Sequence, residues 1–307
     1  MQTLVESAGI ALQAIWASKL RSLMTVLGNI VAVTSIIAVV ALIQGLNASV
    51  KDAILNQAGA DSFSVQQFPA ITTDEAFDAV RYNPRITPAD AEAIRRYAER
   101  VSAVMLQSQI TGQVAYRDKQ IDNATVHGVS EEFTEFSTFD AERGRLMNTV
   151  EVERSRPVVL IGWEIADRLF GGVDPLEKDL RVEGVRFRIV GVSEKRGAFL
   201  GQSQDNFVVI PIGQFQTLYG GRRQLSITVK PRRLEDIGLA MDEATVALRV
   251  ARRLRPKEPD DFGLFTSDTF LDLYRQATSG IFAVLVGIVA LSLVVGGIVI
   301  MNIMLMV

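Results

Sequence analysis

The chain has 307 residues, of which 48% are apolar and 22% charged, and its formal net charge is −3. A weakly acidic chain without a basic tract is a poor nucleic-acid binder, because neutralising phosphates needs clustered lysine and arginine. The chain has no cysteine and one histidine, which excludes disulfide frameworks, zinc–thiolate sites, cysteine nucleophiles and zinc motifs built on two histidines.

The N-terminal region predicts a surface helix followed by a membrane span. Apolar residues recur at the helical period within residues 1–21, which indicates an amphipathic helix lying on the cytoplasmic membrane surface. Residues 22–46 carry no charge and are long enough to cross a bilayer, so we predict a first transmembrane helix there. Positive charges in short segments stay cytoplasmic, so Lys19 and Arg21 set the topology with the N-terminus inside.

The C-terminal region, residues 276–307, is a second run without any charge. It exceeds the length that a helix needs to span a bilayer, and a buried core helix rarely stays uncharged on every face for so long. We predict a second transmembrane helix, which runs from the outside to the inside. Residues 47–275 are therefore expected to form an extracytoplasmic domain.

This outer segment predicts a mixed α/β fold. A helix should begin at Pro88 with Thr87 as its cap, and Glu183-Gly184 should form a two-residue hairpin turn. Further helices are expected over 163–170 and 234–254, a short helix or turn over 131–139, and a loop over 71–86. Strands are expected over 62–68, 103–110, 113–116, 124–129, 157–161, 180–182, 185–192, 207–211, 224–230 and 263–266. Strand–helix–strand at each end of the segment favours a ferredoxin-like sandwich, and the hairpins of residues 113–212 favour an inserted β-rich subdomain.

No catalytic set emerges from the motifs. There is no G-x-x-x-x-G-K-[ST] phosphate loop and no G-x-S-x-G elbow. His127 lies in a strand pattern, where a surface or hairpin histidine is a commoner reading than a catalytic base. Asp205 and the pair Asp260-Asp261 have oxygen ligands for a cation, but no third ligand at a suitable spacing accompanies them.

Four arginines, at 249, 252, 253 and 255, end the helix predicted over 234–254. Cations favour the C-terminus of a helix, which accounts for them without a ligand. The alternative is a basic patch that faces lipid headgroups or a partner.

Small and polar residues in the two spans indicate contacts between membrane helices. Small residues spaced four apart let helix backbones approach, and asparagine is costly against lipid. Glycine and other small residues are also common in any membrane helix. The residues expected to pack against other helices are Gly28, Asn29, Ala32, Ala283, Gly287, Ser292, Gly296, Gly297 and Asn302.

Several motifs, taken together and in order, resemble MacB/FtsX-type ABC permeases. They are Leu20–Gly28 (LRSLMTVLG), Val158–Gly162 (VVLIG), Ala166–Gly171 (ADRLFG), Asp174–Lys178 (DPLEK), Phe187–Val192 (FRIVGV), Val208–Pro211 (VVIP) and Ser292–Leu305 (SLVVGGIVIMNIML). The chain departs from the family pattern at Asn29, Ala32, Glu177 and Val299. These differences affect packing details and leave the order of motifs intact.

The resemblance implies a permease subunit of the cell inner membrane that works as a homo- or heterodimer with a separate ABC ATPase. ATP and magnesium would bind that ATPase, so no cofactor or metal is expected in this chain and the chain itself is not expected to be an enzyme. An extracytoplasmic adaptor protein is a further partner that the resemblance allows. Family members have four spans, so the third and fourth are expected to be missing and the chain to be truncated after the second.

By the same resemblance, ATP-driven movement would close the outer domains and expel lipoprotein, peptide or drug-like substrates. Other readings stay open. A two-span receptor would carry a sensing domain outside the membrane, and a membrane-anchored enzyme would need a catalytic set that is not apparent. A regulator of cell-wall hydrolases of the FtsX kind is disfavoured because residues 47–275 are more than such a regulator usually has outside the membrane.

Overall fold

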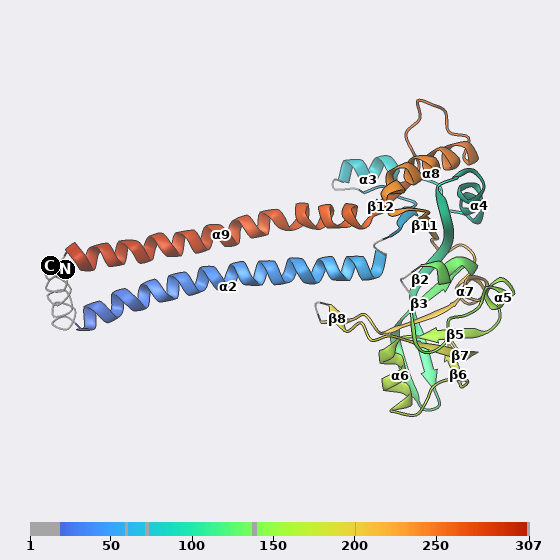
Figure 1. Ribbon diagram of the computed structural model, residues 1–307, viewed down its shortest axis with the longest axis horizontal. Coiled ribbons are helices and arrows are strands. Elements are labelled where there is room, and N and C mark those ends of the chain that lie inside the picture. The colour runs from blue at the N-terminus through green and yellow to red at the C-terminus, as the bar shows by residue number, and fades with distance from the viewer. Residues whose placement is uncertain (1–18, 59–60, 71–73, 137–139, 200, 306–307) are drawn as a thin grey trace. The chain divides into compact units, whose positions relative to one another are not determined.

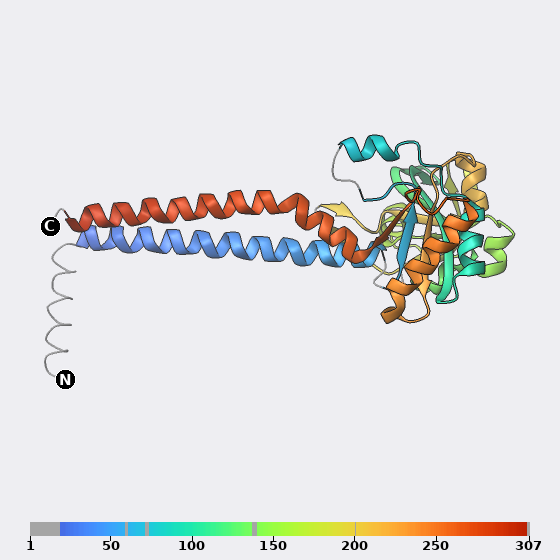
Figure 2. The same cartoon turned by 90° about the horizontal axis from the view of Figure 1, so that it is seen from above.

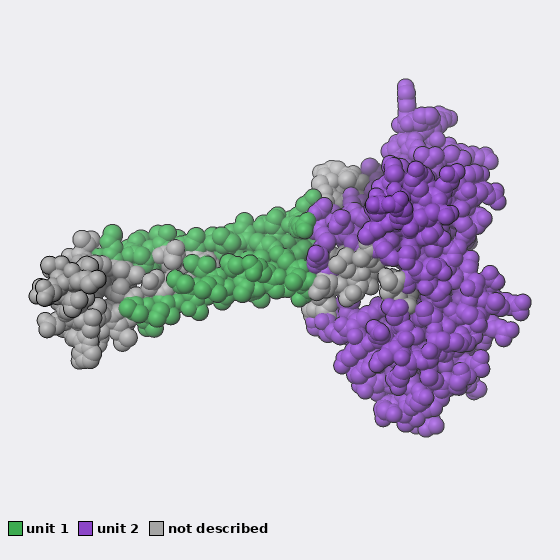
Figure 3. Space-filling view, viewed as in Figure 1, with its two compact units in different colours: residues 1–50, 274–307 green, residues 51–273 purple. Residues whose placement is uncertain are grey.

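The computed structural model describes residues 19–58, 61–70, 74–136, 140–199 and 201–305. The predicted surface helix over 1–21 therefore lies almost wholly outside the described residues. The chain divides into two compact units, one formed by residues up to Val50 together with those from Tyr274 onward, and the other by Lys51–Leu273 (Figure 3). We call the second unit the core domain.

Two long helices make up the first unit. Helix α2 covers Lys19–Ala58 and helix α9 covers Ser267–Leu305, and both views show them running alongside each other (Figures 1 and 2). Among the described residues, Val33–Lys51 is the one segment that is long and apolar enough to cross a membrane. It overlaps the span predicted over 22–46. Whether residues 276–305 of α9 also cross a membrane stays a prediction.

Large apolar side chains on both helices are open to solvent. Such a continuous apolar surface is unfavourable in water and marks an interaction site or a membrane segment. Side chains at least 43% exposed are Val26, Leu27, Ile30, Val31, Val33, Ile37, Val40, Leu42, Ile281, Val284, Val286, Ile288, Leu291, Val294, Ile298 and Met301.

The core domain alternates strands and helices, so the mixed α/β fold is confirmed. Its strands are β1 (Phe63–Gln66), β2 (Val101–Tyr116), β3 (Lys119–Val129), β4 (Ala141–Gly144), β5 (Val158–Ile161), β6 (Asp179–Val182), β7 (Val185–Ser193), β8 (Ala198–Phe199), β9 (Gln202–Ser203), β10 (Phe207–Pro211), β11 (Ser226–Pro231) and β12 (Gly263–Thr266). Its helices are α3 (Asp74–Val80), α4 (Pro88–Tyr97), η1 (Glu131–Glu135), α5 (Thr149–Glu153), α6 (Trp163–Phe170), α7 (Ile212–Tyr219), η2 (Leu234–Asp236) and α8 (Ile237–Ala251).

Ten strands form one sheet, in the order β12-β1-β11-β2-β3-β10-β5-β7-β4 with β6 pairing to β2 and β7. The first four strands are all antiparallel to their neighbours. Helix α4 lies between β1 and β2 in the chain, and α8 lies between β11 and β12, which is the connectivity of a split βαβ sandwich. We call residues 61–107 and 226–273 the base part and residues 108–225 the inserted part.

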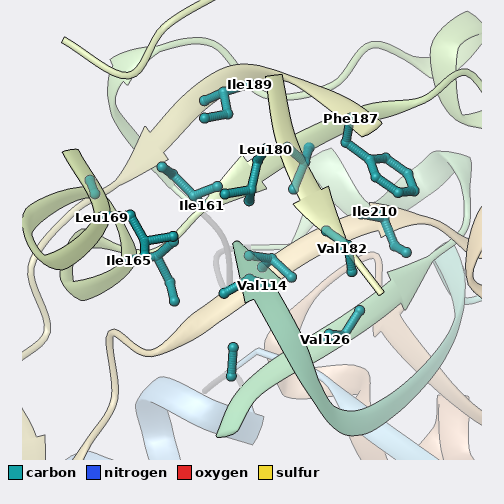
Figure 4. Packing of buried hydrophobic residues seen from close by; sticks show 14 of the residues in the cluster. Val114, Val126, Ile161, Ile165, Leu169, Leu180, Val182, Phe187, Ile189 and Ile210 are labelled. Atoms are coloured by element: carbon teal, nitrogen blue, oxygen red, sulfur yellow. The ribbon is translucent and has the colours of Figure 1, made fainter. Parts of the chain in front are cut away.

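The inserted part buries both faces of its central strands. On β10, Val208 and Ile210 enter one apolar cluster, while Phe207 and Val209 enter another. Successive side chains of a strand point to opposite faces, so the two clusters lie on opposite sides of the sheet. Helices α6 and α7 cover the first side and α5 with η1 the second. Figure 4 shows the first cluster, with Ile165 and Leu169 of α6 beside the strand residues.

Most predicted elements are present, and several local predictions are confirmed. Thr87 and Asp90 form a capping box at the start of α4, with Pro88 in the first turn. Glu183 and Gly184 have φ of +48° and +81°, as a two-residue turn with two positive φ values requires. Helix α6 spans the predicted 163–170.

Other predictions were wrong. The loop expected over 71–86 contains helix α3, and the strands expected over 103–110 and 113–116 are one strand, β2, with a shift of register between Gly112 and Val114. The helix expected over 234–254 begins as the short η2 and ends at Ala251. Helices α5 and α7 and strand β4 were not expected.

Candidate functional site

The strongest cluster of charged residues in the core domain joins the end of α8 to the start of α4. Arg252 donates from Nε and Nη2 to the two carboxylate oxygens of Asp90, at 3.0 and 2.9 Å, and from Nη1 to Asp261 at 2.9 Å. The side chains of Arg252 and Asp90 are only 8% and 6% exposed. We call Arg252, Asp90 and Asp261 the arginine clasp.

Asp90 is ionised in this setting. Burial alone would raise the pKa of its carboxyl, but the hydrogen bonds and positive charge of Arg252 outweigh burial, and the Thr87 backbone N–H adds a further bond at 2.8 Å. The net result is a pKa below the usual value. A buried ion pair with both carboxylate oxygens satisfied holds one geometry, so α4 and α8 are fixed to each other at this point.

The clasp lies directly before the strand that leads into α9. Asp261 is followed by Phe262 and by β12, and α9 begins at Ser267, immediately after β12 ends. At that junction the Thr266 hydroxyl accepts from the Thr269 backbone N–H at 3.2 Å, and the Thr269 hydroxyl accepts from the Thr266 N–H at 3.3 Å. This reciprocal pairing is that of a helix cap. The chain therefore enters α9 from a hydrogen-bonded strand through a capped first turn.

Close backbone packing fixes β12 as well. A Cβ added to Gly263 would lie 2.4 Å from the carbonyl oxygen of Phe68 and from Cα of Pro69, so only glycine fits there. Four residues of β12 pair with β1, from Gly263 opposite Gln66 to Thr266 opposite Phe63. The sheet thus fixes the position of the strand that leads directly into the N-terminus of α9.

The predicted basic patch at the end of α8 is largely neutralised by carboxylates. Arg249 pairs with Asp260 and also donates to the carbonyl oxygens of Arg255 and Glu258, at 2.7 and 3.0 Å. Arg252 binds Asp90 and Asp261 in the arginine clasp. The Nε atom of Arg255 lies 3.8 Å from Oε1 of Glu258. Asp260 and Asp261, considered above as cation ligands, each bind an arginine instead.

The Asp205 carboxylate binds backbone N–H groups of a neighbouring loop. Its side chain is buried, and its two oxygens accept from the backbone N–H groups of Arg196 and Gly197 at 2.7 and 2.8 Å. The carboxylate thus closes the base of the loop that carries β8 and β9. It is not positioned as a metal ligand with other acidic groups of the described chain.

His127 lies on β3, where its ring meets the edge of the Phe207 ring at 5.9 Å between centroids. Burial, aided by the positive charge of Arg196, lowers the pKa of the imidazole to about 4. The ring is therefore neutral near pH 7. His127 lies on the β2–β3 hairpin, which supports the reading of a surface or hairpin histidine over that of a catalytic base.

Of the residues predicted to pack between membrane helices, the structure describes the surroundings of Ala283, Gly287, Gly296 and Gly297. Ala283, Gly287 and Gly297 are exposed, and a Cβ added to Gly287, Gly296 or Gly297 would meet nothing within 4 Å. The structure does not describe the side chains of Lys19, Arg21, Asn29, Ala32, Ser292 and Asn302, or the surroundings of Gly28. Contact of the packing residues with further helices, and the setting of the topology by Lys19 and Arg21, stay predictions.

Comparison with known proteins decides the family. The sequence model of the MacB-like periplasmic core domain matches residues 22–247. The chain belongs to this family. It is thus a MacB-like ABC transporter permease by family, as the resemblance in its motifs predicted.

Curated relatives and solved structures agree. The chain is 31% identical over 271 residues to the macrolide export ATP-binding/permease protein MacB of Chlorobaculum tepidum, covering 87% of this chain and 41% of that protein. It is 30% identical over 305 residues to the protein of the same name from Neisseria meningitidis serogroup B, covering 98% and 45%. The chain therefore spans less than half the length of these curated relatives.

Two solved structures share the fold. The periplasmic region of MacB from Actinobacillus actinomycetemcomitans aligns with a TM-score of 0.58 at 19% identity, over 72% of this chain and 95% of that one. The extracellular domain of the noncanonic ABC-type transporter YknZ from Gram-positive bacteria aligns with a TM-score of 0.53 at 18% identity, over 67% and 100%. Both likenesses cover much of this chain and nearly all of the extracytoplasmic region solved in each relative.

Proposed function

We propose that this chain is the permease subunit of an ABC exporter, set in the inner membrane with residues 47–275 outside the cytoplasm. ATP would be hydrolysed, with magnesium, by an ATPase domain or subunit outside these 307 residues. Two permease protomers would act together, with an adaptor protein as a further partner. The family membership and the apolar segment Val33–Lys51 support this proposal.

The observation that carries the proposal is the unbroken path from the core domain into α9. Helix α9 has 39 residues and follows β12 without a linker. At 1.5 Å per residue it is about 58 Å long, against a bilayer core of about 30 Å. A continuous helix of this length can carry a change of tilt at one membrane face to the strand at its other end.

The core domain is built to receive such a movement. Displacement of Ser267 would act on β12, which is hydrogen-bonded to β1, and on the clasp, which ties Asp261 to α4 and α8. A force on α9 would therefore move the base part as a body. Closure of two such domains would expel a substrate on the outer side, and the relatives named for macrolide export favour drug-like substrates over lipoproteins or peptides.

The proposal is tested by reconstituting this chain in liposomes with and without an ABC ATPase of the same organism. We expect ATP turnover and macrolide transport with both components, and neither with this chain alone. The matched control carries an ATPase whose phosphate-loop lysine is replaced. Robust ATP turnover by this chain alone, or transport that persists with the inactive ATPase, would contradict the proposal.

A further inference from the structure

A cavity of about 400 Å³ lies where the chain passes from the inserted part back to the base part. It is lined by Arg85, Tyr219, Gly220, Gly221, Arg222 and Arg223. Arg85 precedes α4 in the base part, whereas the other five follow from the last turn of α7 in the inserted part. The hollow is open to solvent, because five of its six lining residues are exposed and Tyr219 is partly buried.

The lining is strongly cationic. Three of its six residues are arginines, and among the described residues none of these three guanidinium groups forms an ion pair with a carboxylate. Arg249 and Arg252 differ in this respect, because aspartates neutralise both of their guanidinium groups.

Hydrogen bonds to backbone carbonyls hold two of the three arginines, Arg85 and Arg223, in place without neutralising them. Arg85 donates from Nη1 to the carbonyl oxygen of Arg222 at 2.7 Å, and Arg223 donates from Nε to the carbonyl oxygen of Tyr219 at 3.1 Å. Each guanidinium has five N–H groups, so several donors of each remain for a ligand. The carboxylate of Glu183 accepts from the hydroxyl of the lining residue Tyr219 at 3.4 Å and from the Gln113 N–H at 2.9 Å, and Glu183 itself does not line the cavity.

Two glycines in the lining leave open space beside the backbone. Gly220 has a φ of +86°, which favours glycine, and a Cβ added at Gly220 or Gly221 would meet nothing within 4 Å. A ligand can therefore approach the backbone between the arginines. Planar guanidinium groups bind carboxylate and phosphate oxygens in pairs of parallel hydrogen bonds.

We propose that this arginine cleft binds a multiply charged anion bearing phosphate or carboxylate groups. The ligand joins Arg85 of the base part to Arg222 and Arg223 of the inserted part, so it also stabilises the contact between these two parts of the core domain. This inference rests on the core domain alone and stands whether or not the chain exports a substrate.

The test is isothermal titration of the full chain in detergent with pyrophosphate in one arm and citrate in the other, at low ionic strength. We expect saturable binding of at least one anion, weakened about tenfold or more by Arg85→Gln or Arg222→Gln, since each removes charge-assisted hydrogen bonds. Arg154→Gln, at an exposed arginine after α5, is the matched control and should bind as the unchanged protein does. Preference for pyrophosphate or for citrate assigns the anion to the phosphate or the carboxylate class.

A second measurement needs no variant. Phenylglyoxal modifies accessible arginines, and mass spectrometry of the treated protein reports each site. Pyrophosphate or citrate should protect Arg85, Arg222 and Arg223 but not Arg154. The proposal is overturned if neither anion binds saturably, if Arg154→Gln weakens binding as much as the cleft variants, or if protection is uniform over all arginines.

Discussion

Arg252 and Asp90 face each other as a two-pronged ion pair, with N–O distances of 3.0 and 2.9 Å, although 162 residues separate them in the chain. Both side chains are almost completely buried. Removing either partner would leave the other charge buried and unpaired, and that is costly in a protein interior.

We therefore expect Arg252→Ala to lower the free energy of unfolding of the full chain by about 3 kcal/mol, the usual cost of breaking a buried ion pair. Denaturant unfolding followed by tryptophan fluorescence measures it. The matched control is Arg255→Ala, whose side chain is 85% exposed and pairs at 3.8 Å, so its effect should stay within about 0.5 kcal/mol. Equal effects of the two substitutions would show that the clasp adds no stability.

Stability should rise with pH between about 4 and 6.5 because of His127. Its pKa is about 4 in the folded chain, below the 6.5 of an unperturbed histidine, so the unfolded chain binds more protons in this window. The free energy of unfolding therefore increases as the pH rises through the window. His127→Gln should flatten this slope, as measured by unfolding at a series of pH values. An unchanged slope would contradict a neutral imidazole with a lowered pKa at this partly buried position.

At lower pH, protonation of Asp90 should weaken the clasp. Its folded pKa is depressed below 3.8, so its contribution to stability is complete above the unfolded value and is lost as the pH falls through the folded value. The difference in unfolding free energy between the unchanged protein and Asp90→Asn should shrink on acidification below pH 4. A difference that stays constant down to pH 2 would count against the ionised pair.

Gly263→Ala should destabilise the junction of β12 with β1 by about 1–3 kcal/mol, because its Cβ would overlap the backbone of Phe68 and Pro69. Gly238→Ala in the first turn of α8 is the control, since a Cβ there meets nothing within 4 Å. That control should be neutral or stabilise by up to about 1 kcal/mol. Thermal unfolding of both variants compares them, and equal melting temperatures would be inconsistent with the packing described.

The mechanical coupling that we propose along α9 can be interrupted within the helix, away from both of its ends. Insertion of two glycines between Arg275 and Gln276 should abolish ATP-dependent transport while the protein still reaches the membrane, because glycine weakens a helix and the insertion changes its register. The same insertion after Gly172, in an exposed turn with open space around it, should leave transport intact. Transport that survives the first insertion would rule out α9 as the coupling element.

Local signals account for the elements that the sequence predicted well. Gly162 and Gly171 bound α6, and Gly171 adopts the left-handed conformation that commonly ends a helix. Uninterrupted apolar runs located β5 and β10, as expected for strands buried on both faces. These features depend on neighbours in the chain and can be read from it.

The unexpected elements depend on distant partners. Helix α7 is short and weakly patterned, and it is fixed by Phe215, which packs against Gly128 of β3. Strand β4 has no alternation and exists through its pairing with β7. The arginine clasp and the arginine cleft both bring together residues far apart in sequence. The sequence showed the arginines at the end of α8, but only the fold shows that aspartates neutralise Arg249 and Arg252 there. No carboxylate among the described residues forms an ion pair with Arg85, Arg222 or Arg223.

Strand β2 has a consequence for how this domain can be divided. Its residues 101–107 pair with β11 and its residues 107–116 with β3, so Gln107 lies opposite a residue of each neighbouring strand. Excising residues 113–212 would strip the neighbour from half of this strand and expose a long unprotected edge, which is prone to aggregate. The insertion is therefore not a removable module, and a variant that isolates the base part should also shorten β2 near Gln107.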